Sequence, residues 1–83
     1  MQRYMVIETF QEGQLEEIYR RLAEKGRGLP EGLFFVESWL SADGLRCFQV
    51  METANPSTFD AWMPFWADLA SFEIVKLRDK PKV

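Results

Sequence analysis

The sequence predicts an α+β fold whose elements follow in the order strand, helix, strand, strand, helix, strand. Three observations carry this prediction: the hydrophobic period changes along the chain, a tight turn joins two apolar runs, and a second helical stripe precedes the last run. A chain of 83 residues builds one domain with a modest core. We therefore expect residues 1–83 to form a single domain.

The first part of the chain predicts one strand and one helix. Residues 3–10, RYMVIETF, are rich in β-branched and aromatic side chains and end at a turn, which is typical of a strand. Apolar residues then recur at the helical spacing i, i+3, i+4, i+7, at Leu15, Ile18, Tyr19 and Leu22. We expect Gly26 to end this helix, because glycine readily adopts the conformation that closes helices, and residues 26–32 to form a loop.

Residues 33–41 and 45–53 are expected to form a hairpin, since the Asp-Gly pair in SADG is typical of a tight turn between apolar strands. If residues 42–44 form a three-residue loop, Glu37 pairs with Gln49 on one sheet face. A two-residue loop would instead pair Glu37 with Val50 and separate the two polar side chains. The three-residue loop predicts that Glu37 and Gln49 are shielded from water beside Trp39.

The last part of the chain predicts a second helix and a closing strand. Asn55 and Pro56 are typical of an N-cap and the first helical position. A second apolar stripe at helical spacing then comprises Phe59, Trp62, Trp66 and Leu69. Residues 72–77, FEIVKL, are expected to form the closing strand, and a polar tail follows.

This order repeats a split βαβ unit and predicts a ferredoxin-like fold, with a four-stranded antiparallel sheet and two helices on one face. The other sheet face is left without a helix. The chain is 47% hydrophobic and 14% aromatic, which is more large apolar surface than so small a core can bury. We therefore expect a homodimer that forms through the helix-free face.

Four stretches of the chain read RYMVIETF, EKGRGLPEGL, VESWLSADGLRCFQVMET and WADLASFEIV. They resemble a domain-of-unknown-function family of small uncharacterised bacterial proteins, placed in the dimeric α/β-barrel superfamily. The resemblance implies a ferredoxin-like protomer that dimerises sheet to sheet, and no activity. Distant relatives in that superfamily include cofactor-independent monooxygenases, haem-degrading enzymes and isomerases. Pro64 departs from the helix-favouring residue expected there, so we expect the second helix to kink near residue 60.

The composition argues against several kinds of site. The chain has no histidine and one cysteine, so it lacks the usual base of a catalytic triad and most ligands for transition metals or haem. We expect no catalytic metal and no cofactor. A net charge of −3 without a basic stripe argues against nucleic acid as a partner. No signal peptide or long apolar run is visible, so we expect a soluble, cytoplasmic protein without membrane contact.

The candidate site residues lie on the hairpin, the second helix and the first strand. Glu37 and Gln49 can orient a small ligand, or Glu37 can act as an acid or base if burial raises its pKa. The same pair can equally be a structural hydrogen bond at an interface. Trp62 and Trp66 can form the wall of an aromatic pocket or belong to the core. Cys47 is expected to be a small buried hydrophobe rather than a nucleophile.

Three functions agree with these residues, and we rank them. The first is a dimeric domain that binds a small apolar or aromatic molecule through Glu37, Trp39, Gln49, Trp62 and Trp66. The second is a cofactor-independent enzyme of the monooxygenase or isomerase type, with Glu37 or Tyr4 as the acid or base and an aromatic substrate stacked on the tryptophans. The third is an RNA-binding module, which the acidic composition disfavours because such modules present aromatic side chains among basic ones.

Overall fold

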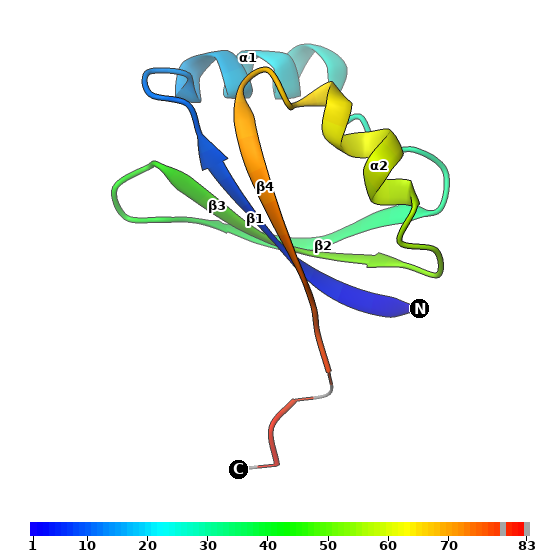
Figure 1. The fold of residues 1–83 in the computed structure, drawn as a ribbon. Helices are drawn as coiled ribbons and strands as arrows, with labels where there is room; N and C mark the ends of the chain where they lie inside the picture. Colours follow the sequence, from blue (N-terminus) through cyan, green and yellow to red (C-terminus); the bar gives the residue numbers. More distant parts are fainter. Residues whose placement is uncertain (79, 83) are drawn as a thin grey trace.

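Figure 1 shows a twisted sheet with both helices on one face. The computed structural model describes residues 1–78 and 80–82. The elements are β1 (Gln2–Phe10), α1 (Leu15–Lys25), β2 (Leu33–Leu40), β3 (Arg46–Thr53), α2 (Thr58–Trp62), the 3₁₀ helix η1 (Met63–Phe65) and β4 (Ala70–Lys76). The strand order is β2-β3-β1-β4, and every pairing is antiparallel. The predicted ferredoxin-like fold is confirmed.

Strand β1 lies in the middle of the sheet, between β3 and β4, and it sorts the two faces by alternation. From its third residue onward, the helix-facing side chains of β1 are buried and comprise Tyr4, Val6, Glu8 and Phe10. The core between sheet and helices is aromatic, because Tyr4 meets Phe59 edge to face at 5.2 Å between ring centroids, and Trp62 meets Phe72 at 5.3 Å. One carboxylate, that of Glu8, therefore enters an otherwise apolar row.

The hairpin loop is one residue longer than predicted. The Ser41 N–H donates to the Arg46 carbonyl, so residues 42–45 form the loop. The Asp43 carboxylate stabilises the longer loop, because Asp43 Oδ1 accepts hydrogen bonds from the Leu45 N–H at 2.9 Å and from the Ser41 hydroxyl at 2.7 Å. These two bonds also lower the pKa of Asp43.

A β-bulge at residue 36 follows from the longer loop. Near the hairpin tip Glu37 pairs with Val50, whereas Phe35 pairs with Met51, so Val36 is the additional residue. The bulge keeps Leu33 and Phe35 on the core side of β2 while the loop places Ser38 opposite Gln49. The predicted pairing of Glu37 with Gln49 is wrong, and the two side chains lie on opposite faces of the sheet.

The second helix differs from its prediction at both ends. It begins at Thr58, because Asn55 forms a preceding turn in which its Oδ1 accepts from the Ser57 N–H at 3.1 Å. It ends at Trp62, where η1 takes over, instead of kinking near residue 60. Pro64 explains the change of helix type, since it has no N–H to donate and its ring clashes with the carbonyl four residues earlier. The predicted stripe is nevertheless buried in full, from Phe59 to Leu69.

The closing strand β4 begins at Ala70, two residues before the predicted start. Its first residue already pairs with Phe10 at the end of β1. Within the described part of the chain, none of the helices is long and apolar enough to cross a bilayer.

Candidate functional site

A cavity of about 150 Å³ lies between α1 and the helix-facing side of the sheet. Its apolar wall consists of Phe10, Ile18, Leu22, Leu40, Trp62 and Trp66. Its polar wall consists of Glu8, Tyr19, Arg27, Ser38, Cys47 and Gln49. Tyr19 and Leu40 are about half exposed, which places the opening where α1 passes over the edge strand β2. An apolar cavity of about this volume holds one benzene-sized ring.

Glu8 is the most unusual group in the cavity wall. Glu8 as a whole is only 6% exposed, and among the described residues no group donates a hydrogen bond to its Oε1 atom. Burial raises the pKa of Glu8 from 4.5 to about 7, and the positive charge of Arg27 offsets part of that rise. A carboxyl group with this pKa changes protonation near neutral pH, as acid–base groups in active sites do.

Arg27 reaches the cavity from the loop between α1 and β2. Its guanidinium carbon lies 3.5 Å from the centroid of the Phe35 ring, and Nη1 donates to Gln49 Oε1 across 3.3 Å. The backbone of this residue is held independently, because the Arg27 carbonyl accepts 2.9 Å hydrogen bonds from the indole N–H groups of Trp62 and Trp66. The two tryptophans of the wall therefore position the loop that carries the cation.

Gly28, the next residue, fixes the path of this loop. Its φ angle is +71°, a conformation that favours glycine, and a Cβ atom there would lie 2.5 Å from Cδ1 of Phe65. The close approach of backbone to ring leaves no room for a side chain, so the loop and η1 pack directly on one another.

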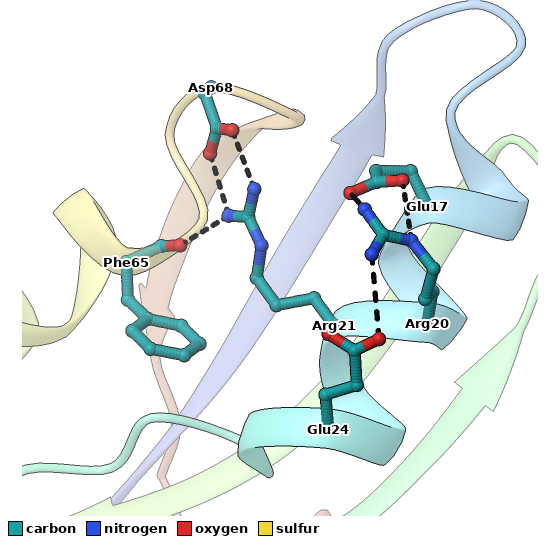
Figure 2. A network of polar contacts seen from close by, with 6 residues as sticks. All are labelled: Glu17, Arg20, Arg21, Glu24, Phe65 and Asp68. Carbon is teal, nitrogen blue, oxygen red and sulfur yellow. Dashed lines mark hydrogen bonds and ion pairs between the residues drawn. The ribbon is translucent and has the colours of Figure 1, made fainter.

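Arg21 connects α1 to the segment that carries Trp66, as Figure 2 shows. Its guanidinium donates to both carboxylate oxygens of Asp68, at 2.8 and 2.7 Å, and to the Phe65 carbonyl at 2.7 Å. The guanidinium carbon also lies 5.5 Å from the centroid of the Trp66 ring. The neighbouring Arg20 contacts only acids of α1 in this network, Glu17 and Glu24. Arg21 thus stabilises the helical wall of the cavity.

Cys47 lies on β3 directly opposite Glu8 and lines the same cavity. Burial, together with the charge of Glu8, raises the pKa of the Cys47 thiol to about 11. The thiolate is the nucleophilic form of cysteine, so this group stays in its weakly reactive state at neutral pH. The described part of the chain contains no group of three or more His, Cys, Asp or Glu side chains that could hold a metal ion.

The structure separates the predicted site residues into two sets. Gln49, Trp62 and Trp66 line the cavity, and all three are buried. Glu37 and Trp39 do not line it: both are exposed, and the Glu37 carboxylate accepts a hydrogen bond from the Ser38 N–H. The predicted shielding of Glu37 beside Gln49 is therefore wrong.

Tyr4, the other predicted acid or base, is packed in the core against Phe59, away from the cavity wall. Sequence reasoning did not select Glu8 or Arg27 as site residues. The available signal for Glu8 was its place in the inward row of β1 with Val6 and Phe10. Arg27 gave no such signal, because a loop arginine between glycines is ordinarily solvated.

The comparisons with known proteins give a family and no activity. A family model described as a domain of unknown function (DUF3303) matches residues 2–79. A search of curated proteins and a search of solved structures each give no match. The unknown-function family expected from the sequence is confirmed, and the match spans nearly the whole chain.

Proposed function

The chain belongs to the domain-of-unknown-function family DUF3303, and from the cavity of this family member we propose that the protein binds a small, largely apolar molecule with an aromatic ring. The binding site is the space between α1, the sheet and the two tryptophans that flank η1, Trp62 and Trp66. The observation that carries the proposal is the combination of an aromatic wall with a buried carboxylate oxygen that has no hydrogen-bond donor within the described part of the chain. Ligand sites typically combine apolar walls with a few placed polar groups.

The free-energy cost of burying Glu8 without a hydrogen-bond donor favours a ligand-binding role over a purely structural one. A buried polar group without a hydrogen bond costs about 1–3 kcal/mol, and an apolar residue at this position would avoid that cost. A bound molecule that satisfies Glu8 recovers this energy and covers the apolar wall at the same time. Arg27 and Gln49 add further polar groups to the cavity wall.

A titration with single-ring probes tests the proposal. We expect benzene and phenol to shift the amide NMR signals of the cavity wall, and the Cys47→Leu variant to weaken both because it fills space beside Glu8. Val50→Leu is the matched control, since it adds volume on the same strand but on the helix-free face. Shifts that are absent in the wild type, or equally reduced in both variants, would contradict the proposal.

A cofactor-independent enzyme of the isomerase or monooxygenase type is the second candidate. One observation favours it: the pKa of Glu8, at about 7, suits a group that accepts and returns a proton at neutral pH. In this version Glu8 takes the acid–base role that the sequence assigned to Glu37 or Tyr4, and no cofactor is required.

We also propose that the partner of the chain is a second copy, bound through the helix-free face as in a dimeric α/β barrel. Cross-strand pairing places Trp39, Phe48 and Ile7 in one row of this face, and Val50, Met5 and Val75 in the next. Trp39 is 54% exposed and Val75 40% exposed, although both are large and apolar.

Charges of both signs surround these two rows. Glu37 and Glu73 lie at their ends, Arg46 lies on one side, and the ion pair of Arg3 with Glu52 lies on the other. An apolar centre with a charged rim is the usual anatomy of a protein interface. Since the rim holds both signs, a twofold-related copy can match acids to bases, which favours this occupant.

A further inference from the structure

Two polar features of the cavity restrict the chemistry of its ligand. Glu8 Oε1 is a hydrogen-bond acceptor to which no group of the described residues donates, and Glu8 is more than nine-tenths buried. Arg27 is a cation with five N–H donors, of which one contacts Gln49 at the long distance of 3.3 Å. An acceptor and a donor thus line the same small space.

We propose that the ligand is a neutral ring bearing a hydroxyl group, of the phenol class, whose O–H donates to Glu8 Oε1 while its oxygen accepts from the Arg27 guanidinium. This inference rests on the proposed ligand-binding function and names the substrate class for that site. A hydroxyl group is donor and acceptor at once, so it satisfies both residues with one atom. The ring occupies the apolar part of the cavity beside Trp62 and Trp66.

Other small ligands satisfy only part of the cavity. An ether or ketone accepts from Arg27 but leaves Glu8 without a donor. A carboxylate ligand is repelled by Glu8 whenever that group is ionised, and an ammonium ligand is repelled by Arg27. Plain benzene fills the volume and satisfies neither polar group.

The affinity for a ligand that donates a hydrogen bond to Glu8 should rise with pH, whereas the affinity for a ligand that can only accept should fall. The charged or titratable groups that face Glu8 are Arg27 from the loop, Cys47 from β3 and Tyr19 from α1, while β4 places Phe72 opposite it. The thiol of Cys47, with its pKa at about 11, stays neutral below pH 9. Glu8 is then the group that changes charge between pH 6 and 8. Because a phenol keeps its proton to about pH 10, it remains a donor over this range.

The experiment compares benzene, phenol, anisole and benzoate by titration calorimetry at pH 6 and pH 8. In the wild type we expect phenol to bind most tightly, more tightly at pH 8 than at pH 6, and anisole to show the reverse trend. The Glu8→Gln variant should weaken phenol about tenfold at pH 8 and remove the pH trends, since hydrogen bonds to charged groups are the stronger ones. The Glu12→Gln variant is the matched control, because it makes the same substitution at an exposed position in the turn after β1, outside the cavity wall and the helix-free face.

The outcomes separate the two proposals. Binding of benzene with no preference for phenol, or a phenol preference that survives Glu8→Gln, overturns the hydroxyl inference and leaves the ligand site standing. Tighter binding of anisole or benzoate than of phenol overturns it as well. If no probe binds the wild type, the proposed function itself fails. Should Glu8→Gln not fold, the opposite pH trends of phenol and anisole in the wild type decide the question.

Discussion

Glu8 on β1 lies directly opposite Cys47 on β3, and both side chains line the cavity under α1. This cross-strand pair places an acid and a thiol side by side in a space that water reaches poorly. Each therefore favours its neutral form, and the pKa values rise to about 7 for Glu8 and about 11 for Cys47. The pair makes the stability of the protein, as well as its ligand chemistry, dependent on the protonation of Glu8.

The pKa of Glu8 predicts that the folded protein loses stability as pH rises from about 4.5 to about 7. In this range the folded state holds a proton on Glu8 that the unfolded state has released, so the free energy of unfolding falls with pH. The full effect is on the order of 3 kcal/mol, since one pKa unit corresponds to about 1.4 kcal/mol. Urea unfolding at pH 5 and pH 8 measures it.

Glu8→Gln should flatten this dependence and stabilise the protein at pH 8, because the amide carries no charge to bury. Glu12→Gln, at an exposed position in the turn after β1, should leave the dependence as it is in the wild type. Asp43 and Asp68 do not mask the effect, since their pKa values are lowered and they titrate below this window. Equal pH slopes in the wild type and Glu8→Gln would contradict the prediction.

Gly28 and Gly26 give a second prediction, in which only one of the two positions has a steric contact. Both have positive φ values, +71° and +69°, so alanine is strained at either position. At Gly28 the added Cβ also meets the Phe65 ring, whereas at Gly26 nothing lies within 4 Å. We expect Gly28→Ala to destabilise the protein by about 1–3 kcal/mol more than Gly26→Ala, as overpacking does. Chemical denaturation of the two variants measures the difference, and equal losses would show that the loop moves away from Phe65 at little cost.

The fold was predictable from the sequence because its signals are local and repeated. The stripe from Leu15 to Leu22 specifies α1, and Gly26 ends that helix as expected. The stripe from Phe59 to Leu69 specifies buried side chains, which lie on α2 and on the turns after η1. The hairpin was identified correctly as an element. The register of the hairpin was predicted wrongly. It depends on the hydrogen bonds of Asp43, which stabilise the longer loop, and on the bulge at Val36, and strand periodicity encodes neither of them.

The site was predictable only in part, and the register explains why. Gln49 and the two cavity tryptophans were identified, but a one-residue shift moves Glu37 to the other face and leaves the carboxylate role to Glu8. Arg27 enters the site through the packing of a loop on Trp62 and Trp66, a contact between residues 35 and 39 positions apart. Long-range contacts of this kind leave no local pattern in the sequence.

Arg21 and Arg20 give a third prediction, since they are neighbours on α1 with different partners (Figure 2). Arg21→Ala should lower the thermal midpoint more than Arg20→Ala, because it removes a bidentate contact to Asp68 and leaves the Phe65 carbonyl without its donor. Arg20 contacts acids one turn away on its own helix, an arrangement that contributes little. Scanning calorimetry of the two variants ranks them, and an equal or reversed ranking would show that α1 does not depend on this contact.

The last prediction concerns the proposed dimer and uses Trp39. We expect sedimentation equilibrium at micromolar concentration to give twice the protomer mass of 9.8 kDa, and Trp39→Asp to reduce it to a single copy. The substitution places a charge in the apolar centre of the helix-free face, where the second copy would have to desolvate it. Leu45→Asp is the matched control, because Leu45 is similarly exposed but lies in the hairpin loop outside the two apolar rows. Single-copy mass for the wild type would refute the dimer, and loss of the dimer in Leu45→Asp alone would move the interface from the sheet face to the hairpin tip.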